Sequence, residues 1–113
     1  LMTRTPYDKS SGASRSGALD AINAASQGYA VVIQDVRGRY SSEGEFYTFV
    51  NETEDGLDSI EWAAAQPWAA GKVGMYGASY VGATQWLAAR SEAPSLAAIV
   101  PTVTASDYHE GWA

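Results

Sequence analysis

The stretch of residues 72–90, KVGMYGASYVGATQWLAAR, constrains the fold more than any other part of the chain. A short and mostly apolar run over residues 73–76 ends at Gly77, and Ser79 follows two residues later. The segment Tyr80–Arg90 then continues without proline and is rich in alanine and long side chains, which favour a helix. The pattern predicts a strand, a sharp turn and a helix, with one hydroxyl at the apex of the turn.

This predicted turn is suited to nucleophilic chemistry. A serine on a tight strand-to-helix turn is pushed out of the sheet, where a base can reach its Oγ. The backbone N–H of Tyr80 would point into the same space at the start of a helix, where it can stabilise an oxyanion. Gly77, Ala78 and Gly82 are the small residues that such a close approach of helix and sheet requires. The alternative is a purely structural turn in which Ser79 caps the helix.

Three other apolar segments are predicted strands. Residues 1–5 look like the last part of an extended segment, because the residue before Pro6 is biased away from helix. They do not look like the natural start of a protein. Residues 29–34 form a nearly unbroken apolar run, which suits a strand buried on both faces of a parallel sheet. Residues 96–100 form a further strand, which we expect Pro101 to end.

Helices and loops lie between these strands. Residues 6–17 contain a proline, four serines and two glycines, which predicts a loop. Residues 18–27 have helical spacing, and Gly28 would end that helix. Its predicted apolar face comprises Ala18, Ile22 and Ala25, with Leu19 beside it. Residues 35–50 have no clear period and predict a long ordered loop, in which Asp35 and Arg37 would make structural hydrogen bonds and charge pairs.

A helix is predicted to begin at Asn51, since Glu54 three residues later completes a typical start signal. Pro67 would end it. Its predicted buried stripe comprises Leu57, Ile60 and Ala64.

This order of elements predicts fold class α/β, with a mostly parallel sheet and helices on both of its faces. Binding sites in such sheets lie beyond the carboxyl ends of the strands. Those ends lead into Tyr7, residues 35–49, Ser79 and residues 102–112. We therefore expect the serine and the irregular loops to meet at one edge of the sheet.

Composition limits the partners. The chain has 113 residues, a 46% hydrophobic fraction and a formal net charge of −6. The negative charge argues against nucleic acid or an anionic membrane as partner, because both bind basic surfaces. No cysteine and a single histidine exclude thiolate catalysis and fall short of a catalytic zinc site, so we expect no metal and no cofactor. Compartment and oligomeric state stay open.

Four pieces of sequence stand at the ends of the predicted strands, in this order: RTPYDK at 4–9, QDVRG at 34–38 with SEGEF at 42–46, GASYVG at 77–82, and TASDY at 104–108. Together they resemble the α/β-hydrolases of the cocaine esterase and X-Pro dipeptidyl-peptidase family. In that family the turn has the sequence pattern G-x-S-Y-x-G, whose second glycine matches Gly82. The more general pattern G-x-S-x-G would instead require a glycine at position 81, which is Val81 in this chain. The resemblance covers nearly the whole chain.

The resemblance implies specific roles. Ser79 would be the nucleophile that forms an acyl-enzyme, and the oxyanion would bind the Tyr7 hydroxyl and the Tyr80 backbone N–H. Residues 1–113 would be the N-terminal part of an α/β-hydrolase catalytic domain, cut at both ends, with residues 102–113 at the start of a helical cap insertion. Trp112 would then line the substrate pocket. Packing roles for Tyr7 and Trp112 are the structural alternatives.

The chain departs from the family pattern in its triad. An α/β-hydrolase supplies serine, acid and histidine in that order. After Ser79 the chain has only Asp107 and His109 to complete the set, and residues two apart are badly placed for the hydrogen bond that orients the imidazole. We therefore expect the acid and histidine to lie downstream, outside this chain, and the chain alone to be inactive.

The sequence thus predicts a serine hydrolase that cleaves acyl ester or amide bonds. Aryl or alkyl esters, α-amino acid esters and X-Pro peptides all stay open as substrates. A non-catalytic α/β binding or interaction module with a structural serine is the alternative from another class.

Overall fold

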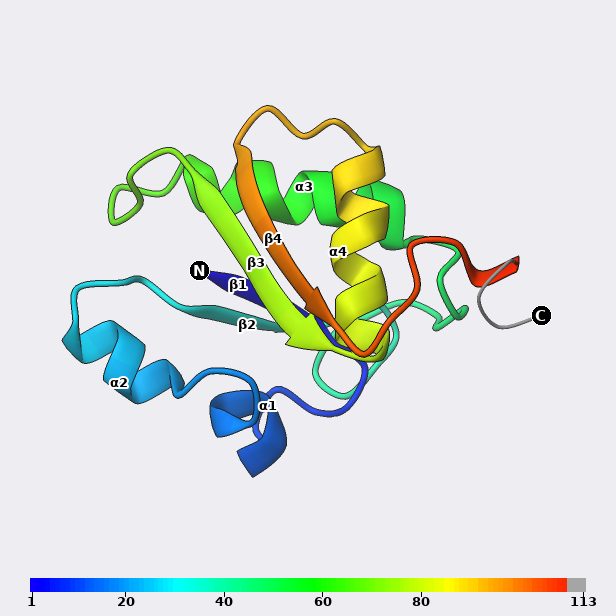
Figure 1. Cartoon of the computed structure of the whole chain (residues 1–113), viewed down its shortest axis with the longest axis horizontal. Coiled ribbons are helices and arrows are strands. Elements are labelled where there is room, and N and C mark those ends of the chain that lie inside the picture. The colour runs from blue at the N-terminus through cyan, green and yellow to red at the C-terminus, as the bar shows by residue number, and fades with distance from the viewer. Residues whose placement is uncertain (110–113) are drawn as a thin grey trace.

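The computed structural model describes residues 1–109 and contains a four-stranded parallel sheet with helices around it (Figure 1). The elements in chain order are β1 (Met2–Thr5), α1 (Gly12–Ser16), α2 (Ala21–Ser26), β2 (Val32–Asp35), α3 (Glu52–Ala64), β3 (Val73–Ala78), α4 (Tyr80–Arg90) and β4 (Leu96–Thr102). None of the helices described in residues 1–109 is both long and apolar enough to cross a membrane.

The strand order is β2-β1-β3-β4, and all three pairings are parallel. Strands β1 and β2 pair from Met2–Val32 to Thr5–Asp35. Strands β3 and β4 pair up to Ala78 and Thr102, so their carboxyl ends lie side by side. The parallel sheet predicted from the alternating pattern is therefore confirmed, and its carboxyl edge collects the loops that follow each strand.

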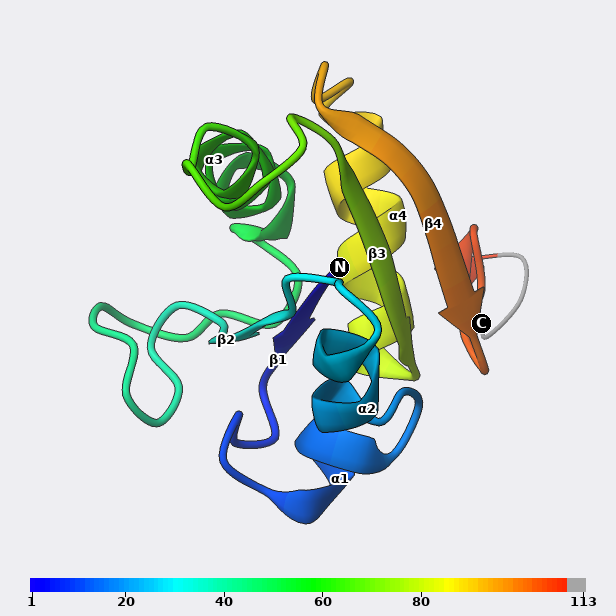
Figure 2. The same cartoon turned by 90° about the vertical axis from the view of Figure 1, so that its left-hand side faces the viewer.

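Helices cover both faces of the sheet. In Figure 2, α4 lies behind β3 and α3 lies beside the strands, while α1 and α2 lie together in the lower part of the view. In β3, Val73, Met75 and Gly77 are buried, whereas the residues between them are only half-buried. This alternation arises because successive side chains of a strand point to opposite faces, and α3 and α4 cover one face more completely than α1 and α2 cover the other.

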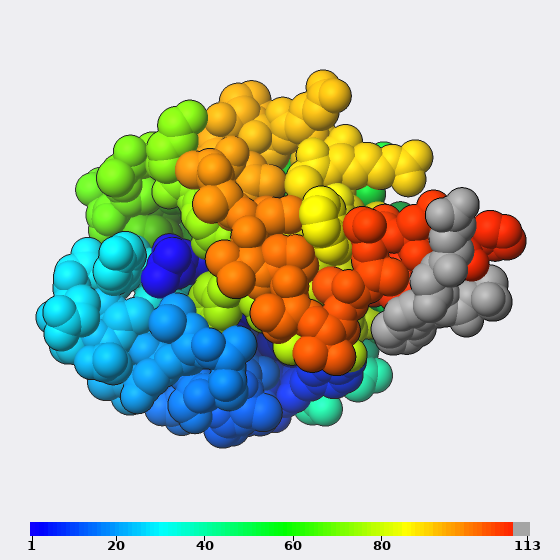
Figure 3. Space-filling model, viewed as in Figure 1, coloured from blue at the N-terminus to red at the C-terminus, as the bar shows by residue number. Residues whose placement is uncertain are grey.

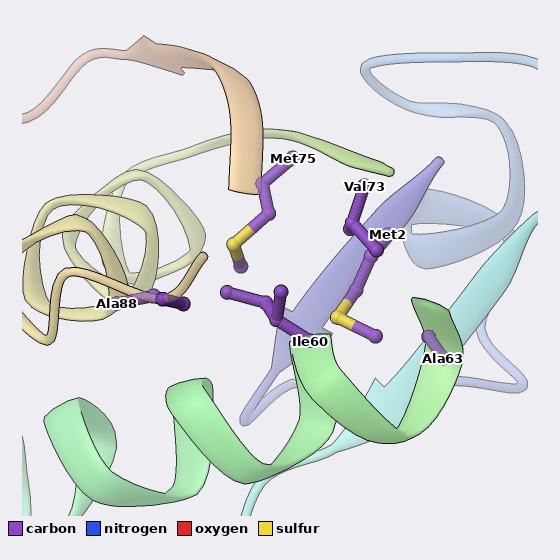
Figure 4. Packing of buried hydrophobic residues seen from close by; sticks show 7 residues of the cluster. Met2, Ile60, Ala63, Val73, Met75 and Ala88 are labelled. Carbon is purple, nitrogen blue, oxygen red and sulfur yellow. The ribbon is translucent and has the colours of Figure 1, made fainter. Parts of the chain in front are cut away.

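The apolar core lies between the sheet and α3 and α4 (Figure 4). Met2 and Met75 from the strands pack with Ile60 of α3 and Ala88 of α4, and each is at most 1% exposed. Burying one such large side chain contributes about 1.5–3 kcal/mol. The predicted stripe of α3 is confirmed, since Leu57 and Ala64 also pack against this cluster.

The N-terminal third differs from the prediction. The predicted loop contains α1, because the Ser11 hydroxyl accepts a hydrogen bond from the Ser14 N–H and caps a helix. Helix α2 begins three residues later than expected, because Asp20 caps it by accepting from the Asn23 N–H. The predicted apolar face is wrong: Ile22 is 71% exposed. Spacing alone did not show which side of so short a helix packs.

The strands also differ in detail. Strand β2 is only half-buried over most of its length, because it is the outer strand of the described sheet. Pro101 does not end β4, which continues to Thr102. Proline is tolerated there because an outer strand needs no donor on its free side. Figure 3 shows the residues of β4 as a broad stripe at the surface, and Val100 is 60% exposed.

Candidate active site at the carboxyl edge of the sheet

Ser79 occupies the apex of the turn between β3 and α4. Its backbone has φ 60° and ψ −126°, a region that costs a non-glycine residue about 1–3 kcal/mol. Hydrogen bonds hold this conformation from both sides. The Ser79 N–H donates to Thr102 O at 3.0 Å, while the Gly82 and Ala83 N–H groups donate to Ser79 O at 2.9 and 3.0 Å. The side chain is exposed as a result.

The turn has no room for β-carbons at its two glycines. Gly77 has φ 137°, and a β-carbon there would lie 2.2 Å from Val81 Cγ1. A β-carbon at Gly82 would lie 2.5 Å from Thr104 Cγ2 and 3.0 Å from Thr102 O. The glycine is thus needed at the point where the first turn of α4 crosses the segment after β4. Ser79 stands at the N-cap position of α4, but its side chain makes no capping hydrogen bond.

Tyr80 begins α4, where a helix leaves its first N–H groups without intrahelical partners. Its side chain is buried and belongs to a polar network. The hydroxyl donates to Glu52 Oε1 at 2.9 Å and accepts from the Phe49 N–H at 3.0 Å. Burial, followed by the charge of Glu52, raises the pKa of Tyr80 well above its ordinary value, so the hydroxyl keeps its proton.

Aromatic rings surround the Tyr80 ring. Phe49 stacks on it with centroids 4.7 Å apart, and Phe46 lies 6.0 Å away. The Tyr7 ring contacts it edge-on, with ring centroids 6.5 Å apart and an interplanar angle of 76°, an arrangement that aromatic pairs prefer. The predicted meeting of Tyr7, the long loop and the serine turn at one edge is confirmed by these contacts.

Tyr7 is 51% exposed and borders a hollow of about 350 Å³. Ser14 of α1 also lines this hollow, as do Ala78, Val81 and Thr102 beside the serine turn. Tyr7 is tied to β1 because its N–H donates to the Thr5 hydroxyl at 3.0 Å. Its hydroxyl therefore belongs to a half-exposed ring next to an open space, and its role toward an oxyanion stays a prediction.

The long loop is held as predicted for Asp35 and Arg37. Asp35 accepts from the Lys9 N–H at 2.7 Å, from Lys9 Nζ at 3.1 Å and from the Ser41 N–H at 3.2 Å. Burial acts to raise the pKa of Asp35, but these hydrogen bonds and the Lys9 charge together hold that pKa below its ordinary value. Arg37 makes a two-pronged pair with Asp55 of α3.

Sequence reasoning missed the buried pair of Arg4 and Glu52. Arg4 Nη1 lies 2.8 Å from Glu52 Oε2, and the two residues are 1% and 3% exposed. An arginine inside a predicted strand was the available signal, because a buried charge requires a partner. The identity of that partner depends on the fold and could not be read from spacing.

A local hydrogen bond joins two of the C-terminal candidates, Asp107 and His109. The His109 N–H donates to Asp107 Oδ1 at 2.9 Å, a local turn contact expected of residues two apart. Trp112 lies outside the described residues, and the cap predicted from residue 102 onward stays a prediction. Within residues 1–109, no group of three or more histidine, aspartate or glutamate side chains is arranged to hold a metal ion.

Comparisons with known proteins identify the family of this chain. The model of the family described as X-Pro dipeptidyl-peptidase (S15 family) matches residues 1–113. The chain belongs to this family. Cocaine esterase of Rhodococcus sp. (strain MB1 Bresler) is 43% identical over 114 residues, which cover 99% of this chain. A putative serine esterase of Mycobacterium bovis is 34% identical over 86 residues, which cover 73% of this chain and 13% of that protein.

Solved structures show the same fold. An aminopeptidase from a marine sediment Thaumarchaeota archaeon matches with a TM-score of 0.75 and 28% identity over 95% of this chain. An α-amino acid ester hydrolase matches with a TM-score of 0.74 and 31% identity, also over 95% of this chain. Each match covers 21% of the solved chain. The S15-family chain therefore has part of an α/β-hydrolase fold, and it spans 20% of the length of cocaine esterase.

Proposed function

We propose that this S15-family chain supplies the nucleophile and the oxyanion donors of a serine hydrolase that cleaves acyl ester or amide bonds. The observation that supports this most is the exposed Ser79 at a positive-φ apex, followed at once by the N-terminus of α4. Strained backbone is retained at functional sites when the surrounding structure holds it in place. Here the end of β4 and the start of α4 do so.

In the proposed reaction, Ser79 Oγ attacks the acyl carbonyl carbon and gives its proton to a base. The carbonyl oxygen becomes an oxyanion, which accepts hydrogen bonds from the Tyr80 N–H and the Tyr7 hydroxyl. The base then gives this proton to the leaving group, which departs as an alcohol or amine and leaves an acyl group on Ser79, and water hydrolyses that acyl group to a carboxylic acid and free Ser79. No cofactor takes part in these steps.

The base and its orienting acid are proposed to lie downstream in the same polypeptide. His109 is the single histidine of the chain, and its neighbour Asp107 is too close in sequence to orient it well. The 113-residue chain by itself is then expected to be inactive. Small esters or amides and short peptides are the proposed substrates, as in the names of the esterase and aminopeptidase relatives. Trp112 is proposed to line their pocket.

A fluorophosphonate probe applied to the full-length protein tests the proposal. Such probes phosphonylate an activated serine, so wild type should be labelled and Ser79→Ala should not. Labelling that persists in Ser79→Ala would assign the chemistry to another residue. A folded wild-type protein that resists the probe would instead support a non-catalytic binding module with a structural serine.

A further inference from the structure

A buried line of polar side chains joins β1, the start of α3 and the residue after Ser79. Arg4 Nη1 donates to Glu52 Oε2 at 2.8 Å, and the Tyr80 hydroxyl donates to Glu52 Oε1 at 2.9 Å. The three residues are 1%, 3% and 9% exposed. Because buried charges are costly unless paired, each of these groups depends on its neighbours to stay where it is.

The far end of this line is fixed by the sheet and by α3. Arg4 Nε donates to Gln34 Oε1 of β2 at 2.7 Å. The same oxygen accepts from the Ser59 hydroxyl at 2.9 Å. Arg4 is therefore held on two sides, and the Glu52 carboxylate cannot rotate without leaving a buried donor unpaired.

The other end of this line of side chains, at Tyr80, contacts both proposed oxyanion donors. Tyr80 carries one of them on its own backbone, and its ring contacts the ring of Tyr7, which carries the other. The Tyr80 hydroxyl also accepts from the N–H of Phe49, whose own φ is 65°. One ring, held at its hydroxyl, thus sets the position of the first residue of α4, the ring of Tyr7 and the end of the long loop.

We propose that Glu52 is a positioning residue, which aligns the Tyr80 N–H and the Tyr7 ring with Ser79 by holding the Tyr80 hydroxyl. This inference rests on the proposed function, and Glu52 itself touches no substrate. A carboxylate suits the task because it offers two acceptor oxygens, one for Arg4 and one for Tyr80. Glutamine would offer a single acceptor oxygen and would place an N–H₂ group against one of the two donors.

Two variants of the full-length protein test the inference. Tyr80→Phe keeps the ring and the backbone N–H and removes only the hydroxyl. Glu52→Gln keeps the shape and removes one acceptor. Ile60→Val, in the separate apolar core, is the control for a loss of stability alone. Fluorophosphonate taken to completion counts the competent sites, and kcat per counted site and KM are then measured with p-nitrophenyl acetate.

Both variants should lower kcat per site about tenfold or more, with KM within about twofold, because small misplacements of reacting groups cost up to about 10² in rate. The double variant should be no worse than the worse single, since both changes break one connection. Ile60→Val should lower Tm and the number of sites but not kcat per site.

An unchanged kcat per site in Tyr80→Phe would overturn the inference and leave Glu52 a purely structural residue. Should Glu52→Gln fail to fold, Tyr80→Phe decides alone. A wild-type protein that is not labelled at Ser79 would refute the proposed function instead, so the two failures are distinguishable.

Discussion

Gly82 packs directly against Thr104, so closely that a β-carbon on residue 82 would lie 2.5 Å from Thr104 Cγ2. This contact brings the segment after β4 onto the first turn of α4, next to Ser79. Thr102, the last residue of β4, accepts a hydrogen bond from the Ser79 N–H at its backbone oxygen. The shape of the serine turn thus depends on a strand that follows it in the chain.

The first prediction concerns this contact. Gly82→Ala should lower the free energy of unfolding by about 1–3 kcal/mol, the usual cost of forcing an extra carbon into a packed site. Denaturant unfolding of the full-length protein would measure it. Gly12→Ala is the matched control, since a β-carbon at Gly12 meets nothing within 4 Å and that glycine is already helical. Equal stability of the two variants would contradict the close packing.

The second prediction concerns Tyr7. In the full-length protein, Tyr7→Phe should lower kcat by about 10²–10³, or about 2.7–4 kcal/mol, because one proposed oxyanion donor is lost. KM and Tm should change little, since the ring and its contact with Tyr80 are kept. Steady-state kinetics measure this. Tyr47→Phe, at an exposed tyrosine of the long loop, should keep normal kcat. A near-normal kcat for Tyr7→Phe would reduce Tyr7 to a packing residue.

The third prediction concerns His109. Replacing it by alanine should change kcat of the full-length enzyme by less than about tenfold, whereas loss of a true triad base costs several orders of magnitude. The physical reason is that Asp107 stands only two residues before His109 and accepts from its backbone N–H, so it is badly placed to orient the imidazole. Kinetics together with a circular dichroism check of folding would decide. A loss of several orders of magnitude in a folded protein would place the base in this chain.

The fourth prediction concerns pH and Asp35. Because the folded pKa of Asp35 is held below its ordinary value, its ionised form stabilises the fold above that ordinary value. The contribution is lost as pH falls through the folded pKa. Asp35→Asn should therefore cost about 1–3 kcal/mol near pH 7, and the difference from wild type should shrink at acidic pH.

Unfolding free energies of wild type and Asp35→Asn, measured from neutral to strongly acidic pH, would check this. Lys9→Met keeps the backbone donor of Lys9 and removes only the ammonium, so it should lose a smaller part of the same pH-dependent stability. A pH-independent gap between wild type and Asp35→Asn would show that Asp35 acts through packing alone.

Local patterns predicted the parts of the fold that local physics determines. The helix Tyr80–Arg90 begins and ends as expected, and the parallel sheet follows from the alternation of apolar runs and helices. The glycine at position 82 was also indicated by the sequence, because it matches the family pattern G-x-S-Y-x-G. Its physical reason, the contact with Thr104, appears only in three dimensions.

Other features depend on partners distant in sequence. The Arg4–Glu52 pair joins residues that no spacing rule connects. The exposed side of α2 was missed because Ile22 looks like a core residue in any helical pattern, whereas only Ala24 of that helix is buried. β4 passes through Pro101 because it is an outer strand, a fact that its own residues do not encode.

The hydrogen bond from Ser79 to Thr102 also has a consequence for biosynthesis. During synthesis Ser79 is added to the chain before the residues of α4, and α4 is added before β4, the strand that carries Thr102. At about 5–20 residues per second, the acceptor arrives on the order of seconds after the serine. During that interval Ser79 lacks the hydrogen bond to Thr102 that helps to hold its backbone at positive φ, and we expect the turn to sample other conformations. The turn geometry of Ser79 is thus withheld from the nascent chain until β4 is in place beside it.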